Sequence, residues 1–378
     1  MKTIQNKLRF LLIIYLIFSG KTEAFSQGFS LLDNQVQTWV DSGYYHGANL
    51  IVGNRQKVLH QKSFGNYQPE TSTYIASAGK WLASATIAVL VDEGKLSWDD
   101  KVVKWLPEFT DAKGQATLRQ LFSHTANYPD YQPRGNHRDD YQTLEESVRH
   151  ILPLSIETPS DASIKRQFKY GGLAMQVAGR MAEIATGKPW ETIFQEKIAR
   201  PLQMSHTHFS PVDSVGGGHS PMLGGGAVST VNDYAHFLQM FLNKGIYKGK
   251  RILSEKAIAE MQADQIGAAF VSMPEFPQKV RAANHKSIYG LGLWREEIDK
   301  KGNATLISSP SWAGAYPWID YKNGIFGFLL THIADGKMGK NNFSSFYASP
   351  VLAYLLRNEI KHTLPSKKTK VKGKISEK

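Results

Sequence analysis

A serine and a lysine, Ser77 and Lys80, stand three positions apart at the start of a long apolar segment, residues 75–94. Residues three positions apart lie on one face of a helix, so the lysine nitrogen can reach the serine oxygen. A neutral amine placed there can accept the hydroxyl proton while the oxygen attacks a carbonyl carbon. The pair therefore predicts a nucleophilic serine, with a helix-capping serine and a solvent-reaching lysine as the alternative.

The apolar surroundings of Lys80 are unusual for a lysine, because a helix that is apolar on nearly all sides is expected to be buried. Bringing the pKa of a lysine from about 10.4 to near 7 costs roughly 4 kcal/mol. Burial produces changes of this size, so burial would itself be the activating device. Spacing alone is a weak signal, since a Ser-x-x-Lys pattern occurs by chance about once in a chain of this length.

The longer sequence context is more specific. Residues 75–109, "IASAGKWLASATIAVLVDEGKLSWDDKVVKWLPEF", closely resemble the serine β-lactamase and penicillin-binding-protein superfamily, and within it the class C β-lactamase and esterase group. Blocks at 116–130, 168–209, 224–253 and 309–320 follow in the same order, so the resemblance covers most of residues 30–357. It implies an α/β fold of the α+β type, with an antiparallel sheet built from both chain ends, flanking helices and a mainly helical middle lobe.

The resemblance also implies roles for individual residues. Ser77 matches the acylated nucleophile of the family, with Lys80 as its partner. Tyr170 begins the sequence Tyr170-Gly171-Gly172, which stands where the family carries Tyr-x-Asn, and becomes a second candidate base. Without the resemblance, Tyr170 would be interpreted as a loop tyrosine that packs on the following helix. Whether Lys80 or Tyr170 accepts the proton during acylation stays open.

A third family motif, usually Lys-Thr-Gly or His-x-Gly, corresponds to Ser309-Pro310-Ser311. In this register the backbone N–H of Trp312 joins that of Ser77 as the oxyanion hole. An alternative register places residues 312–314 at the motif and makes Ala315 the donor.

Four residues near this motif are expected to contact substrate: Ser309, Ser311, Trp312 and Tyr316. The two aromatic ones belong to a cluster with Trp294 and Trp318. For aromatic residues on strands, the competing interpretation is that they fill the core of the sheet; as substrate contacts they would form apolar pocket walls.

Two departures from the family pattern bear on the substrate. Gly172 replaces the asparagine that, in β-lactam-binding members, holds the acyl side-chain amide, and the third motif lacks the basic residue that faces the substrate carboxylate. A site without such a polar partner discriminates poorly for the missing group. We therefore expect a carboxylesterase-like hydrolase of esters or small amides. The alternatives are a β-lactamase, a D-alanyl-D-alanine carboxypeptidase, or a catalytically silent binding or sensor protein.

Two other patterns carry weaker signals. The spacing of His124, His137 and Asp139 matches no metal motif, and the glycine-rich residues 215–230 lack the Gly-Lys-Ser/Thr ending of a phosphate loop. There is no cysteine, which excludes disulfides, thiol nucleophiles and thiolate metal sites. We expect no metal and no cofactor.

The elements that must position these residues follow from periodicity and turn residues. Residues 29–43 predict a helix and residues 46–53 and 56–65 a β-hairpin. The middle, about 75–265, is mainly helical. Strands are expected at 289–297, 304–309, 315–321 and 325–332, with a turn at 322–324, followed by a closing helix over 344–359.

The chain has 378 residues, of which 42% are hydrophobic and 21% charged, as in ordinary globular proteins. Residues 1–26, with a basic start and an apolar stretch at 10–20, predict a cleaved signal peptide. Residues 27–362 would form the hydrolase domain and residues 363–378 a basic disordered tail, so the net charge of +12 does not indicate a nucleic-acid partner. We expect a periplasmic or secreted monomer that takes a small ester or amide, with no transmembrane segment after cleavage.

Overall fold

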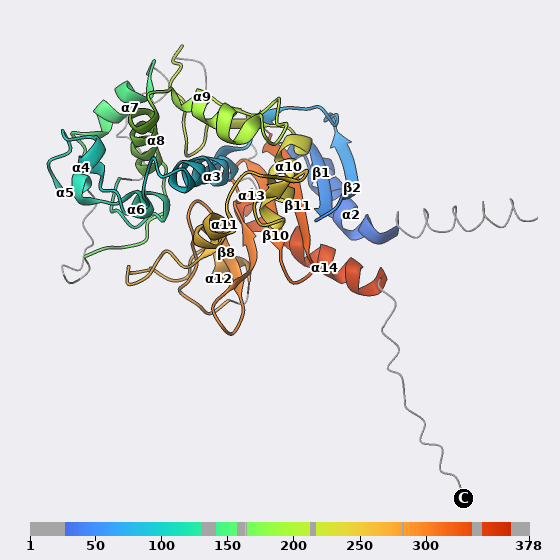
Figure 1. The fold of residues 1–378 in the computed structure, drawn as a ribbon. Helices are drawn as coiled ribbons and strands as arrows, with labels where there is room; N and C mark the ends of the chain where they lie inside the picture. The colour runs from blue at the N-terminus through green and yellow to red at the C-terminus, as the bar shows by residue number, and fades with distance from the viewer. Residues whose placement is uncertain are drawn as a thin grey trace, which may run out of the picture. The chain divides into compact units, whose positions relative to one another are not determined.

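A central antiparallel sheet joins the two ends of the chain. The computed structural model describes residues 27–129, 141–156, 163, 165–211, 217–281, 283–334 and 342–363. The sheet has the strand order β2-β1-β11-β10-β9-β8, and Figure 1 shows the N-terminal strand β1 beside the C-terminal strand β11. Its strands are β1 (Tyr45–Asn54), β2 (Val58–Gly65), β8 (Trp294–Ile298), β9 (Ala304–Ser308), β10 (Gly314–Asp320) and β11 (Ile325–Ile333). The sheet predicted from both chain ends is confirmed.

The strands form because their residues can be buried in a pleated sheet. All residues of β10 are buried, as are nearly all of β11 and β1, which is typical of central strands covered on both faces. The turn between β10 and β11 ends at Gly324, whose φ of 64° favours glycine. The edge strand β2 has more exposed residues than β1, as expected for a strand that pairs with a neighbour on one side only.

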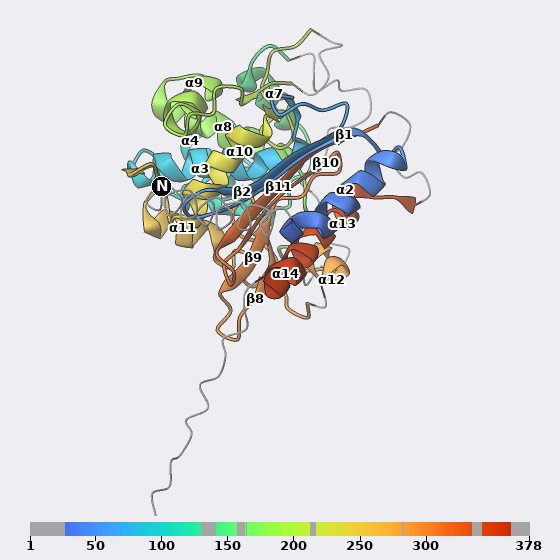
Figure 2. The ribbon, with the colours of Figure 1, turned by 90° about the vertical axis from the view of Figure 1, so that its right-hand side faces the viewer.

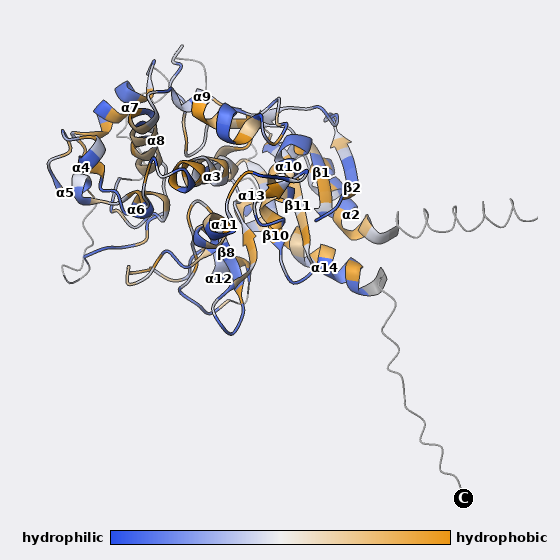
Figure 3. Cartoon of the chain, viewed as in Figure 1, coloured by the Kyte–Doolittle hydropathy of each residue, from blue (hydrophilic) through white to orange (hydrophobic). Residues whose placement is uncertain are grey.

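The helical middle lies on one side of this sheet (Figure 2). Helix α3 (Gly79–Asp92) is buried from Gly79 to Leu90, and Gly94, with φ 69°, ends it where the sequence predicted. Figure 3 shows mixed polar and apolar residues along outer helices such as α7. The other helices here are α4 (Val102–Trp105), α5 (Ala112–Gln115), α6 (Leu118–Phe122), α7 (Leu144–Ile151), α8 (Leu173–Thr186), α9 (Trp190–Phe194), the π-helical turn η3 (Gln195–Ala199), α10 (Val231–Leu242) and α11 (Glu255–Gln262).

Short strands within the middle were not predicted, because segments of two or three residues carry no periodic signal. Strands β3 (Thr73–Tyr74), β5 (Ala227–Ser229) and β4 (His208–Phe209) form a small sheet, and β6 (Ile246–Tyr247) pairs with β7 (Lys250–Arg251). In continuation of β3, the Ile75 N–H donates to the Ala227 carbonyl at 2.9 Å. The small sheet therefore fixes the chain just before Ser77.

The chain divides into two compact units. One contains residues up to Gln35 and from Leu352 onward, where the Leu31 N–H and the Ser30 hydroxyl donate to the Glu359 carboxylate. The other, Val36–Val351, contains every candidate site residue. The remaining elements are η1 (Gln27–Phe29), α2 (Ser30–Asp41), α12 (Phe276–Val280), α13 (Ser345–Ala348) and α14 (Val351–Thr363). Among the described residues, no helix combines the length and apolarity needed to cross a bilayer.

The prediction of a single closing helix over residues 344–359 is wrong in one respect. The structure has two helices, α13 and α14, separated at Ser349 and Pro350. Proline lacks a backbone N–H and disfavours helical geometry in the residue before it, so a helix is interrupted there.

Candidate active site

Ser77 lies in a tight turn at the entrance to α3. It is the middle residue of the 3-10 turn η2 (Ala76–Ala78), which runs directly into the helix. Ala76 has φ 44°, a left-handed conformation that costs a non-glycine residue on the order of 1–2 kcal/mol. The Tyr234 hydroxyl from α10 donates to the Ala78 carbonyl at 2.7 Å. The turn is thus strained locally and held by its neighbours, a combination that is frequent at functional sites.

Lys80 contacts Ser77 from inside the protein. Its Nζ lies 3.1 Å from the Ser77 Oγ, and only 3% of the lysine is exposed. The same nitrogen donates to the Gly224 carbonyl at 2.5 Å. The alternative in which Lys80 extends to solvent does not occur in this structure.

Tyr170 completes a cluster with these two residues. The Lys80 Nζ lies over the Tyr170 ring, 4.8 Å from its centroid. On β8, Trp294 stacks on the same tyrosine, with centroids 5.2 Å apart and planes at 30°. Tyr170 precedes α8, whose N-cap is Gly172. The two motifs that are 90 positions apart in the sequence therefore meet around the Lys80 nitrogen.

Gly224, whose carbonyl accepts the hydrogen bond from Lys80, packs against a second glycine, Gly172. A Cβ atom on Gly224 would lie 2.9 Å from the Cα of Gly172, so the two backbones approach closely. A Cβ on Gly172, by contrast, would meet no atom within 4 Å. Gly224 was missed by sequence reasoning because it contributes a backbone carbonyl; the glycine-rich run around it was the available signal of a close backbone approach.

The end of β9 reaches the nucleophile turn through Ser309. The Ser309 hydroxyl donates to the Ser77 carbonyl at 3.0 Å. The register of the third motif stays a prediction. Ser311 is buried, with its N–H bonded to the Ala315 carbonyl at 2.8 Å. Trp312, 45% exposed, lies at the surface of this turn. Its backbone N–H stays a prediction as the second oxyanion donor.

Tyr316 requires a correction. The sequence assigned it to the substrate surface, but it is fully buried in β10 and its hydroxyl donates to Glu296 at 2.9 Å. Glu296 in turn pairs with Arg281 at 2.6 Å. The side chain is held in the core by this polar cluster, as the competing interpretation of the aromatic residues stated. Trp294 and Trp318 are buried as well.

His124 is a buried titratable group beside the cluster. Its ring lies 4.8 Å from the Tyr170 ring, between centroids, and its Nε2 is hydrogen-bonded to the Tyr289 hydroxyl at 3.2 Å. Burial, and after it the charge of Lys80, lowers the pKa of His124 well below its ordinary value. The other two candidates of the rejected metal pattern, His137 and Asp139, lie outside the described residues.

The lowered pKa of His124 predicts that acid destabilises the protein. Below about pH 6.5 the unfolded chain binds a proton at this histidine and the folded chain does not, so the free energy of unfolding falls by up to about 1.4 kcal/mol per pH unit. The loss continues downward until the folded pKa is reached. Urea unfolding at pH 7, 6 and 5 should show a shallower pH dependence in His124→Phe. The same slope in both proteins would contradict the prediction.

Together these contacts describe a hydroxyl within reach of a buried amine, an aromatic hydroxyl-bearing ring next to that amine, and backbone groups around the turn. A hydroxyl activated in this way can attack a carbonyl carbon and form a covalent ester. Among the described residues, no group of three or more histidine, aspartate or glutamate side chains is arranged so that it could hold a metal ion.

Comparison with known proteins agrees with this arrangement. A family model described as beta-lactamase matches residues 32–343. A solved structure from Bacteroides dorei, provisionally described as a β-lactamase, is 47% identical with a TM-score of 0.81, and the match covers 87% of this chain and 98% of that one. The hydrolase EstCE1, described as having promiscuous acyltransferase activity, is 19% identical with a TM-score of 0.65, covering 89% and 98%. At that identity it supports the fold alone.

Curated relatives cover less of the chain. The D-alanyl-D-alanine-carboxypeptidase/endopeptidase AmpH of Escherichia coli K12 is 24% identical over 305 residues, which are 73% of this chain and 75% of AmpH. A second protein of that strain, provisionally described as a D-alanyl-D-alanine carboxypeptidase, is 28% identical over 206 residues, 47% of each chain. The present chain thus spans about half the length of that relative.

Proposed function

This chain belongs to the β-lactamase family and is a serine hydrolase, and we propose that it is exported and cleaves esters or small amides through a covalent acyl-enzyme on Ser77. The observation that carries the proposal is the 3.1 Å contact between the Ser77 Oγ and the Nζ of a lysine that is almost completely buried. Export rests on the predicted signal peptide at residues 1–26.

In the proposed acylation, the Ser77 Oγ forms a bond to the substrate carbonyl carbon while its proton passes to the Lys80–Tyr170 pair. The backbone N–H groups of Ser77 and Trp312 stabilise the negative oxygen of the tetrahedral intermediate. The bond to the leaving alcohol or amine then breaks, and the leaving group takes up the proton. Water attacks the acyl-enzyme and releases the acid, which restores the Ser77 hydroxyl.

The preference for esters is supported by what the site lacks. Gly172 offers no side-chain amide to an acylamino substituent, and Ser309 and Ser311 offer no cation to a substrate carboxylate. Both groups are central to the recognition of β-lactams and peptides in the related enzymes that carry them. Their loss removes discrimination for those substrates and leaves acyl transfer possible.

Replacing Gly172 by asparagine tests this explanation. The Gly172→Asn side chain has room, because a Cβ there meets nothing within 4 Å, and asparagine is a favourable N-cap for α8. We expect acylation by benzylpenicillin to accelerate about 10-fold or more, the order of magnitude of one added polar partner. Stopped-flow acylation rates measure it. Gly172→Ala is the matched control, and an equal acceleration in both variants would contradict the explanation.

Active-site labelling tests the function itself. A fluorophosphonate probe should form a bond between phosphorus and the Ser77 oxygen as fluoride leaves, and p-nitrophenyl esters should be turned over faster than nitrocefin. Peptide mass spectrometry locates the adduct. A protein that is not labelled at Ser77, or that hydrolyses nitrocefin faster than short-chain esters, would overturn the proposal.

A D-alanyl-D-alanine carboxypeptidase is the second candidate, and the relationship to AmpH favours it. Release of D-alanine from a peptide ending in D-alanyl-D-alanine distinguishes the two. If this release exceeds ester hydrolysis in kcat/KM, the peptidase is the better description.

A further inference from the structure

His124 occupies a backbone position that normally belongs to glycine. It follows the short helix α6, and its φ of 56° is left-handed. The Thr125 N–H donates back to the Gln120 carbonyl at 3.1 Å, which closes the helix end in the manner of a Schellman motif with His124 at its left-handed residue. A side chain there costs on the order of 1 kcal/mol relative to glycine. The imidazole ring is therefore placed against the local backbone preference.

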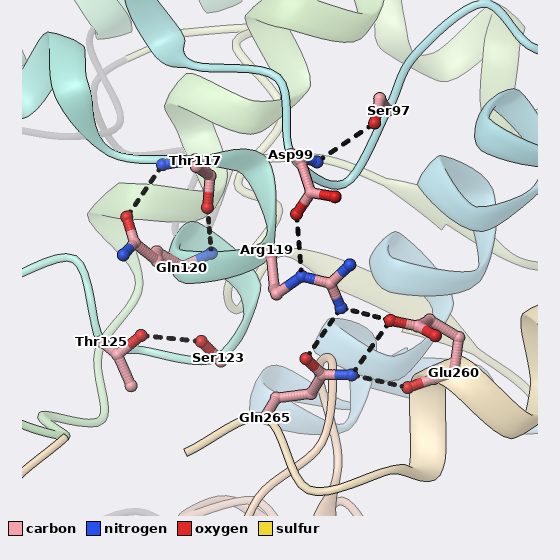
Figure 4. A network of polar contacts seen from close by, with 9 residues as sticks. All are labelled: Ser97, Asp99, Thr117, Arg119, Gln120, Ser123, Thr125, Glu260 and Gln265. Atoms are coloured by element: carbon pink, nitrogen blue, oxygen red, sulfur yellow. Dashed lines mark hydrogen bonds and ion pairs between the residues drawn. The ribbon is translucent and has the colours of Figure 1, made fainter. Parts of the chain in front are cut away.

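Helix α6, which precedes His124, is held by polar contacts, and the hydroxyls of Ser123 and Thr125 on either side of His124 are hydrogen-bonded at 2.9 Å (Figure 4). Thr117 and Gln120 form a reciprocal capping box at the start of α6. On the same helix, Arg119 pairs with Glu260 of α11 and donates to Gln265 at 2.9 Å. These contacts fix the helix from which His124 follows, and the Schellman-type bond fixes the turn, so the position of the His124 ring is defined.

From this turn His124 reaches Tyr170 in two ways. Its carbonyl accepts the N–H of Lys169, the residue before Tyr170, at 2.9 Å. Its ring packs on the Tyr170 ring, with planes at 54°, and is itself fixed by the hydrogen bond to Tyr289. The backbone just before Tyr170 and the Tyr170 ring are thus both tied to His124.

We infer that His124 is a positioning residue, which holds Tyr170 at the angle where its ring meets the Lys80 nitrogen. The inference rests on the proposed function, because the role given to His124 is to position Tyr170, which with Lys80 takes up the Ser77 proton in the proposed acylation. The titratable groups that face Tyr170 in this cluster are Lys80 from α3, His124 after α6, and Tyr289 before β8. A displaced Tyr170 ring changes the environment of the Lys80 nitrogen, so the pH dependence of acylation must change with it.

The test compares His124→Asn with Tyr289→Phe. Asparagine tolerates the left-handed backbone, so His124→Asn removes the ring with little strain. A displacement of about 1 Å at a reacting group can cost on the order of 100-fold. We expect kcat for p-nitrophenyl acetate to fall between about 10- and 100-fold, KM to change less than about 3-fold, and the pH profile of kcat to shift.

Tyr289→Phe keeps its ring and removes the hydroxyl that fixes the imidazole, so it should show a smaller change in the same direction. The double variant should be no worse than His124→Asn, because both act through one contact. Folded variants, checked by thermal unfolding, with kcat within about 2-fold of the wild type or an unchanged pH profile would overturn the inference. Fluorophosphonate labelling distinguishes a failure of the proposed function from a failure of the role inferred for His124. An unlabelled wild type refutes the function, and variants labelled at the wild-type rate refute only the role of His124.

Discussion

Replacing Ser77 by alanine is expected to abolish acyl-enzyme formation and to lower kcat/KM for p-nitrophenyl esters by at least about 1,000-fold, because the variant lacks the oxygen that attacks the carbonyl carbon in the proposed acylation. The Ser77 Oγ is the atom that contacts Lys80, and its backbone is held by Ser309. No phosphorus adduct should form with a fluorophosphonate. The comparison is made by labelling, followed by steady-state hydrolysis.

Ser84 provides the matched control. It is a fully buried serine on the apolar helix α3, which begins directly after the turn that carries Ser77. Ser84→Ala should keep hydrolysis within about 3-fold of the wild type, since its hydroxyl is not part of the cluster. Equal labelling of wild type and Ser77→Ala would remove the enzyme interpretation altogether.

Lys80→Met is expected to lower acylation by about 100- to 10,000-fold, the range associated with positioned acid–base groups. Methionine has a similar length and suits the buried surroundings of residue 80, so the fold should survive. The Gly224 carbonyl loses a donor, but the protein no longer buries an amine, and these effects on the free energy of unfolding oppose each other. Single-turnover acylation and urea unfolding measure the two quantities separately.

Lys80→Arg distinguishes proton acceptance from charge. A guanidinium remains protonated at every accessible pH and cannot accept the Ser77 proton. The arginine variant should therefore be as slow as Lys80→Met. Substantial activity in Lys80→Arg would show that a positive charge beside Ser77 is sufficient, and the proposed role of the amine would be wrong.

The spacing of Ser77 and Lys80 predicted their contact, while the other site residues came from the family resemblance. Helix geometry places the fourth residue of a Ser-x-x-Lys run next to the first, so the contact between Ser77 and Lys80 could be predicted from their spacing. The apolar context predicted that Lys80 is buried, and it is. Tyr170 was reached through the resemblance, because no local rule relates positions so far apart.

Backbone contributions were out of reach of this reasoning. Gly224 acts through a carbonyl that every residue has, and only the close approach of Gly172 explains why glycine stands there. Tyr316 was misplaced because an aromatic on a strand can face either side, and the buried partner Glu296 decides which. The sequence placed His124 only in a rejected metal pattern, because its left-handed φ and its contact with Tyr170 are visible in coordinates alone.

The pairing of β1 with β11 has a consequence for when reactivity can arise. The Thr331 hydroxyl donates to the Gly47 carbonyl across 284 positions of chain. Contacts this distant form late, because closing so long a loop costs more entropy than any local pairing. Ser77 leaves the ribosome early, yet Gly224 and Ser309 leave much later. A chain still growing on the ribosome therefore lacks the Gly224 and Ser309 contacts around Lys80 and Ser77 until most of the chain has been made.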